Sequence, residues 1–126
     1  MKDIENEEDI KNLVDRFYEK VIDDPEIGFI FTKVVAVDWG VHLPIMYNFW
    51  GSILLGSGAY SGHPMQKHIE LDKLVPLEDH HFKKWLFLWR NTVHENFEGV
   101  SAEEAVSRAT NIAALMKYKV VQSRNR

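Results

Sequence analysis

The 126-residue chain contains no cysteine. This absence excludes disulfide bonds, thiolate metal sites, a cysteine nucleophile and any attachment of a prosthetic group through thioether bonds. A metal site in this chain must therefore use histidine, carboxylate or tyrosine ligands. A chain of this length can bury enough apolar surface to fold without covalent cross-links, so we expect one domain over residues 1–126.

Long hydrophobic runs are also missing, since the longest apolar stretches fall well short of the roughly 20 residues that span a bilayer. The opening MKDIENEEDI is acidic and lacks the pattern of a secretory signal. Fifteen basic and 19 acidic side chains give a formal net charge of -4, which argues against a surface for nucleic-acid phosphates. We expect a cytoplasmic protein that spans no membrane and binds no nucleic acid.

The residues that are present favour helices. Asn6 and Asp9 resemble a capping arrangement, and Pro25 ends the helix that follows. Apolar residues between them recur at the i, i+3, i+4, i+7 spacing of an amphipathic helix. This inward stripe comprises Ile10, Leu13, Val14, Phe17, Tyr18, Val21 and Ile22.

A second helix is expected from Trp39 or His42 to Leu55, with a stop at Gly56. Pro44 implies that this helix starts near Val41 or kinks. The apolar segment 26–40 before it has a Val-rich centre typical of a strand, but no partner strand is evident, so we predict an all-α chain.

Two further helices follow Pro76. The third carries an apolar face and closes at Gly99, and Ser101 with Glu104 forms a capping box for the fourth. The expected inward residues are Phe82, Trp85, Leu86, Trp89, Val93 and Phe97 on the third helix, and Ala105, Ala109, Ile112, Ala113, Met116 and Val120 on the fourth.

The most informative segment for function runs from His42 to Leu71, where two histidines flank an aromatic-rich helical face and a loop with several glycines. Two imidazoles facing one apolar slot suggest a buried cofactor. Taken singly, His68 is more often a surface histidine, Tyr18 is more often a core tyrosine bonded to backbone, and a core tryptophan is the alternative for Trp85. If buried, however, the hydroxyl and the indole N–H each need a hydrogen-bond partner.

Two other classes remain open from the residues alone. A helical interaction module would use the aromatics only as core. A non-haem metal protein would use His63 and His68 with nearby carboxylates, although no H-E-x-x-H or similar spacing occurs. We assign His80 and His81 to solvent, because adjacent helical side chains diverge. The available carboxylates are Glu70, Asp72 and Asp79.

Read together, several segments resemble group III of the truncated haemoglobins. The matching segments are FYEKV at 17–21, GFIF at 28–31, His42, NFWGSILLG at 48–56, YSGHPMQKH at 60–68 and KKWLFLW at 83–89. The likeness extends from about Asn6 to Lys119. The absence of a Gly-Gly pair agrees with it, because the other groups carry glycine motifs. The resemblance implies a 2-on-2 helical sandwich around non-covalent haem b.

The resemblance also assigns roles. It makes His68 the proximal haem ligand and Tyr18 a distal phenol, with Trp85 and His42 as the distal tryptophan and histidine. Phe31 would pack against the porphyrin, Met46 would face the bound ligand, and Phe49 and Trp50 would form walls. Lys67 is a candidate partner for a haem propionate. Met46, in place of a branched aliphatic residue, and Pro44, before the helix face, depart from the family pattern.

Donors from Tyr18 and Trp85 would stabilise the partial negative charge of bound dioxygen. At roughly 1 to 2 kcal/mol each, two hydrogen bonds could slow release by one to three decades. Such tight binding is poor for bulk transport but suits sensing, scavenging, nitric oxide dioxygenation or peroxidase-like turnover. The expected partners are dioxygen, nitric oxide or other diatomic molecules, and turnover needs an external reductase. We expect a monomer or weak homodimer.

Overall fold

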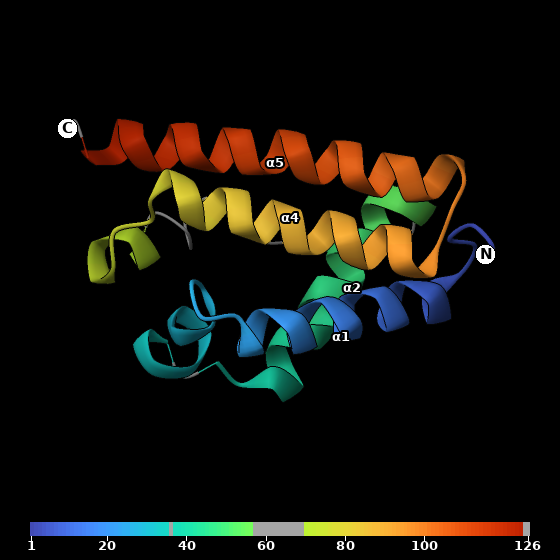
Figure 1. Ribbon diagram of the computed structural model, residues 1–126, viewed down its shortest axis with the longest axis horizontal. Helices are drawn as coiled ribbons and strands as arrows, with labels where there is room; N and C mark the ends of the chain where they lie inside the picture. Colours follow the sequence, from blue (N-terminus) through green and yellow to red (C-terminus); the bar gives the residue numbers. More distant parts are fainter. Residues whose placement is uncertain (36, 57–69, 125–126) are drawn as a thin grey trace.

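The computed structural model describes residues 1–35, 37–56 and 70–124, and within these ranges the chain is helical and contains no strand (Figure 1). The elements are α1 (Glu7–Asp23), the π-helical turn η1 (Ile30–Val34), α2 (Trp39–Leu55), α4 (Asp79–Asn96) and α5 (Val100–Arg124). A further helical turn covers 70–74. The all-α prediction is confirmed. No helix in the described ranges is both long enough and apolar enough to cross a bilayer.

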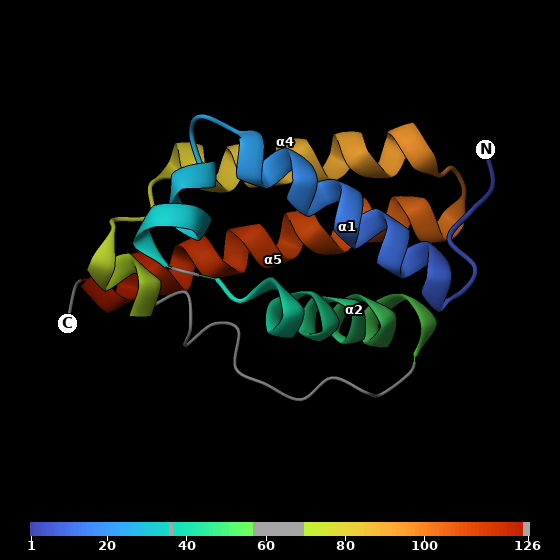
Figure 2. The same ribbon diagram turned by 90° about the horizontal axis from the view of Figure 1, so that it is seen from below.

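The four long helices form two packed pairs. One pair is α1 with α2, and the other is α4 with α5, whose helices run antiparallel (Figures 1 and 2). α1 also packs against α4, which joins the two pairs. The arrangement is the 2-on-2 sandwich expected from the resemblance. At one end of the sandwich, η1 and the turn at 70–74 lie near the start of α4 and the end of α5. The core is made largely by the inward stripes of α1, α4 and α5.

α1 forms as the sequence predicts. The Asn6 side chain accepts a hydrogen bond from the Asp9 backbone N–H at 2.9 Å, which caps the first turn. The helix ends at Asp23, just before Pro25. Its stripe is buried with one exception, since Ile22 is 38% exposed. Ile22 lies in the last turn, about 100° around the helix from the buried Val21.

α2 begins at Trp39, where the Asp38 side chain accepts from the Gly40 N–H at 3.1 Å. Pro44 therefore lies inside the helix, beyond the first turn where proline costs little, and it deprives the Gly40 carbonyl of its hydrogen bond. The stop at Gly56 is confirmed. This residue adopts a left-handed conformation with φ of 67° that favours glycine.

The segment between α1 and α2 is a tight turn followed by η1, and not a strand. Gly28 makes it possible, because a Cβ atom there would lie 2.5 Å from the Ile22 carbonyl oxygen and 2.9 Å from that of Val21. Both contacts are with backbone, which cannot swing away as a flexible side chain would. The close approach aims Ile30 and Phe31 at the interior.

We expect Gly28→Ala to destabilise the protein by about 1–3 kcal/mol, since overpacking against well-packed neighbours typically costs that much. Thermal or urea unfolding of the variant measures the effect. An alanine variant as stable as the wild type would show that the end of α1 relaxes without cost.

α5 is capped differently from the prediction. Asp3, near the chain start, accepts hydrogen bonds from the Ser101 and Ala102 N–H groups at 2.9 and 2.8 Å. The capping box of Ser101 and Glu104 was thus wrong, because a carboxylate distant in sequence satisfies the first-turn donors. Gly99 lies in the connection, three residues after α4 ends at Asn96. The expected apolar stripe of α5 is confirmed.

Candidate functional site

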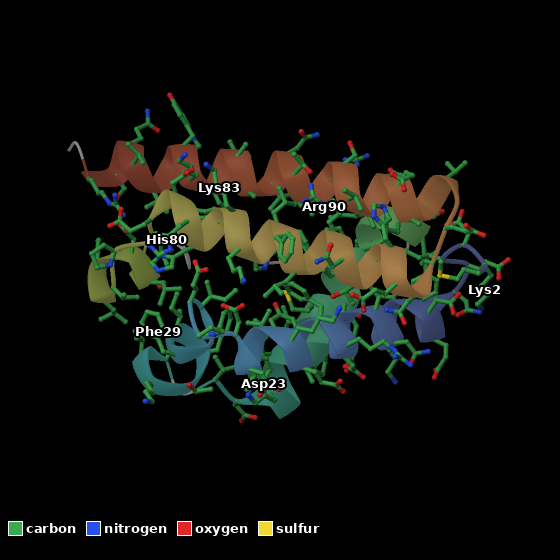
Figure 3. The ribbon with its side chains drawn as sticks, viewed as in Figure 1. Lys2, Asp23, Phe29, His80, Lys83 and Arg90 are labelled. Atoms are coloured by element: carbon green, nitrogen blue, oxygen red, sulfur yellow. The ribbon has the colours of Figure 1, made fainter. Side chains whose placement is uncertain are left out.

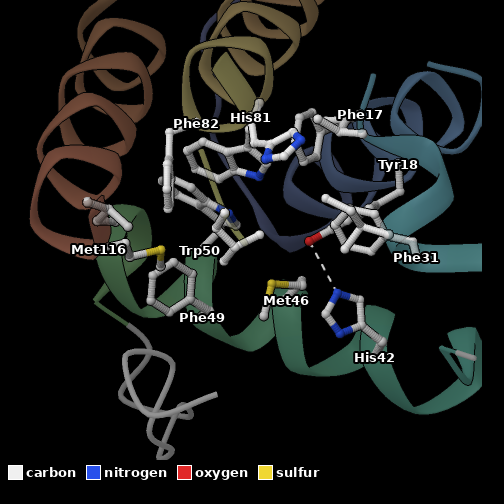
Figure 4. A pocket seen from close by; sticks show the side chains of 15 residues that line it. Phe17, Tyr18, Phe31, His42, Met46, Phe49, Trp50, His81, Phe82 and Met116 are labelled. Atoms are coloured by element: carbon white, nitrogen blue, oxygen red, sulfur yellow. Dashed lines mark hydrogen bonds between the residues drawn. The ribbon is translucent and has the colours of Figure 1, made fainter. Parts of the chain in front are cut away.

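A cavity of about 150 Å³ lies between the helix pairs, partly open to solvent (Figure 4). α1, η1, α2, α4 and α5 all contribute to its wall, together with the turn before η1 and the chain just before α4. All seven predicted site residues within the described ranges line it. They are Tyr18, Phe31, His42, Met46, Phe49, Trp50 and Trp85.

Two of these residues form a polar pair inside largely apolar walls. The hydroxyl of Tyr18 and Nε2 of His42 lie 3.2 Å apart, joining α1 to α2 across the cavity (Figure 4). Tyr18 is only 8% exposed. Burial raises the pKa of its phenol well above the ordinary value, so the hydroxyl keeps its proton at any physiological pH. The cavity therefore contains a permanent O–H donor.

Aromatic rings hold Tyr18 in place. Its ring packs edge-on against Phe17 and Phe31, with centroid separations of 4.9 and 6.0 Å, and lies 5.3 Å from Trp39. Phe31 comes from η1 and Trp39 from the start of α2. The hydroxyl position therefore depends on the packing of three separate elements, which restricts its rotation.

α2 presents one continuous face to the cavity. His42, Met46, Phe49 and Trp50 recur at spacings of four, three and one residues, which places them on one side of a helix. Trp50 is 3% exposed and stacks on Trp89 at a centroid distance of 4.3 Å. This stack anchors the inner end of the α2 face to α4.

The two tryptophans of α4 have different roles, because one is a core residue and the other lines the cavity. Trp89 is fully buried, and its indole N–H donates to the Ala105 carbonyl at 3.1 Å. Trp89 is thus a core residue. Trp85, one turn earlier with its ring parallel to that of Trp89, lines the cavity. Of the two, only Trp85 is placed to reach a ligand there.

The assignment of His81 to solvent was wrong. His80 is exposed and pairs with Glu26 at 3.3 Å, but the half-buried ring of His81 lines the cavity. The two rings do not diverge, since their centroids are 4.1 Å apart. His81 precedes Trp85 by four residues and so shares its face of α4. That spacing was the signal in the sequence that could have identified it.

Other cavity residues were not predicted as site residues, although the positions of most of them in the sequence pointed to the site. Phe17 adjoins Tyr18, Phe82 adjoins His81, and Ile112 and Met116 belong to the predicted stripe of α5. Outside the long helices, Ile30 belonged to the GFIF segment of the resemblance, whereas nothing in the sequence marked Ile27 or Leu77. The wall residues not assigned to the site beforehand are Phe17, Ile27, Ile30, Leu77, His81, Phe82, Ile112 and Met116.

His63, Lys67 and His68 lie outside the described residues, so their assignments stay predictions. Among the carboxylates considered for a non-haem metal site, Asp72 accepts hydrogen bonds from Arg124, and Asp79 pairs with Lys83 and Lys117. These ion pairs lower the pKa of both carboxyl groups, that of Asp79 to about 2. In the described part of the chain, no three His, Asp or Glu side chains gather as a metal site.

The cavity fits a porphyrin by the chemistry of its wall. Aromatic and aliphatic side chains dominate, and the polar groups are few and include no carboxylate, lysine or arginine among the described lining residues, as expected for a large apolar cofactor. Its volume is below the roughly 300–1,000 Å³ of most cofactor pockets. A bound macrocycle would therefore extend through the open side or push α2 and α4 apart.

Comparisons with known proteins agree with this geometry. The family model of bacterial-like globins matches residues 2–119. The chain is 33% identical over 112 residues to the group 3 truncated hemoglobin ctb of Campylobacter jejuni, covering 86% of each chain. The crystal structure of the group III truncated hemoglobin from Campylobacter jejuni superposes with a TM-score of 0.82 at 32% identity, covering 95% of each chain. The chain therefore belongs to the bacterial-like globin family, as a group III truncated haemoglobin.

Proposed function

We propose that this globin binds haem b non-covalently, with His68 as the proximal ligand, and holds dioxygen tightly in a polar distal pocket. Membership of a globin family indicates binding of small ligands through haem. The observation that carries the finer proposal is the convergence of Tyr18, His42 and Trp85 on one apolar cavity. Haem would supply an iron whose sixth position stays open to a diatomic ligand when one imidazole occupies the fifth.

The Tyr18 hydroxyl is the principal donor. It has one proton, which either donates to His42 Nε2 or points elsewhere in the cavity. When the His42 tautomer with a proton on Nε2 donates to the phenol oxygen, the Tyr18 proton is free to donate to a ligand. His42 therefore acts as a positioning residue that decides where the Tyr18 proton points.

Trp85 adds a second hydrogen-bond donor, and its indole N–H can only donate, never accept. Met46 and Phe49 present apolar surface opposite α4 and limit the entry of water, which strengthens both hydrogen bonds. Two bonds of about 1–2 kcal/mol each would slow ligand release by about one to three decades. The proposed pocket retains oxygen instead of exchanging it rapidly.

The same pocket supports oxygen-dependent turnover. In nitric oxide dioxygenation, nitric oxide and dioxygen combine with an electron from an external reductase and leave as nitrate. In peroxidase-like turnover, donors such as Tyr18 and Trp85 would support the negative charge that develops as an O–O bond breaks. The first activity is tested by adding an oxygen-free solution of nitric oxide to the oxygenated protein and measuring nitrate as the product.

The haem proposal has a direct test. Hemin added to the apoprotein should bind in a one-to-one ratio, give an intense Soret band, and raise the melting temperature by about 10 °C at a free concentration near 100 times Kd. The stabilisation follows because hemin would bind the folded cavity and not the unfolded chain. Absorption titration and thermal unfolding measure both effects.

Two results would contradict this proposal. A folded, colourless protein that ignores hemin would favour the helical interaction module. Purified protein that contains stoichiometric zinc or iron without porphyrin would favour a non-haem metal site. Metal analysis and absorption spectra of protein from haem-replete cells distinguish these cases.

A further inference from the structure

His81 forms part of the cavity wall close to the surface of the protein. It lies in the first turn of α4, one turn before Trp85, and its neighbour His80 is exposed (Figures 3 and 4). Its ring lies edge-on to Phe29 at a centroid distance of 6.4 Å. His81 thus belongs to the solvent-side edge of the cavity, whereas Trp50 and Trp89 mark the inner end.

The hydrogen bonds of His81 define which ring nitrogen carries the proton. Nδ1 accepts from the Glu78 backbone N–H at 2.9 Å, so in the neutral ring the proton is on Nε2. Burial and the neighbouring His80 lower the pKa of His81, against a weaker opposite effect of Glu78 and Glu26, which favours the neutral form. Nε2 is therefore an N–H donor and has no lone pair for a metal.

This donor has no acceptor in the part of the chain that the structure describes. A partly buried donor in an apolar wall is best satisfied by an acceptor on the molecule that fills the cavity. The strongest acceptors of haem are its two propionate carboxylates, which carry its peripheral negative charge and favour the solvent-side edge.

We propose that His81 Nε2–H donates a hydrogen bond to a haem propionate and so retains the cofactor. The inference rests on the proposed haem-binding function. It makes His81, and not only a lysine such as Lys67, a recognition residue for the porphyrin periphery. The two cavity imidazoles then have different roles, since His42 pairs with Tyr18 in the distal pocket and His81 binds the edge of the porphyrin.

The test compares His81→Leu with the exposed neighbour His80→Leu as a matched control. Each protein is loaded with hemin or with hemin dimethyl ester, which lacks the carboxylate charge, and transfer to excess apomyoglobin is timed. We expect His81→Leu to lose hemin about tenfold faster, as for one hydrogen bond to a charged group. Its loss of the dimethyl ester should match the wild type, and His80→Leu should change neither rate.

A further variant separates donation from packing and capping. His81→Gln keeps an N–H donor and should restore slow hemin loss, with thermal unfolding of each apoprotein confirming the fold. The inference would be overturned if His81→Leu lost hemin and its ester at equally increased rates, or if His81→Gln lost hemin as fast as His81→Leu. Unchanged hemin loss with altered oxygen dissociation would also overturn it, and would place Nε2 at the iron ligand. If the wild-type chain takes up no hemin, the proposed function itself fails.

Discussion

Replacing His68 with alanine is expected to abolish stable haem retention. In the proposed site, the coordinate bond from the His68 imidazole to iron is the main anchor of haem, and the chain has no cysteine that could attach haem through a thioether bond. Loss of a residue that merely supports a metal ligand already costs about 10–100-fold in affinity. We therefore expect hemin to dissociate at least about 100-fold faster, as measured by transfer to apomyoglobin.

The matched control is His80→Ala, because His80 is an exposed histidine whose partner is Glu26. It should retain hemin like the wild type. Added imidazole should partly restore the spectrum of the His68→Ala holoprotein by occupying the vacated coordination position. Equal retention in the two alanine variants would remove His68 as the ligand and direct attention to the other cavity imidazoles.

The second large effect concerns oxygen release. Among the described lining residues, Tyr18 supplies the one O–H donor, and Tyr18→Phe removes it but leaves the aromatic contacts with Phe17 and Phe31 in place. We expect the oxygen dissociation rate to rise about 10- to 30-fold, equivalent to a hydrogen bond of about 1.4–2 kcal/mol. Stopped-flow displacement of oxygen by carbon monoxide measures the rate.

Tyr47→Phe is the matched control for this substitution. Tyr47 lies on the same helix as His42, but its hydroxyl donates to Asp15 outside the cavity. Burial and that bond raise the pKa of Tyr47 to about 12. The variant should release oxygen at the wild-type rate. If Tyr18→Phe also left the rate unchanged while both variants stayed folded, the Tyr18 hydroxyl would lie beyond reach of the ligand.

The comparison of sequence with structure shows which features are locally encoded. The periodic stripes of α1, α4 and α5 were readable because each helix buries one side, and the spacing of buried residues repeats every three or four positions. The inward face of α2 was readable for the same reason, which placed His42, Met46, Phe49 and Trp50 together. Even the stop at Gly56 depended only on local backbone geometry.

Features that join distant segments were not readable in this way. The cap of α5 comes from Asp3, nearly a hundred residues earlier, so the local pair of Ser101 and Glu104 gave a false signal. The role of His81 depended on how α4 packs against the turn that carries Phe29. A single helix face shows which side is buried, but not what lies opposite it.

The sequence by itself determined that this chain is helical, lacks thiol chemistry and belongs with the group III truncated haemoglobins, because periodicity, composition and motif spacing are properties of the linear chain. Only the tertiary structure decided that Tyr18 and His42 meet at 3.2 Å, that Trp89 is core while Trp85 faces the cavity, and that the His81 ring also lines it. Those relations depend on how helices pack in three dimensions, which the order of residues along one helix does not specify.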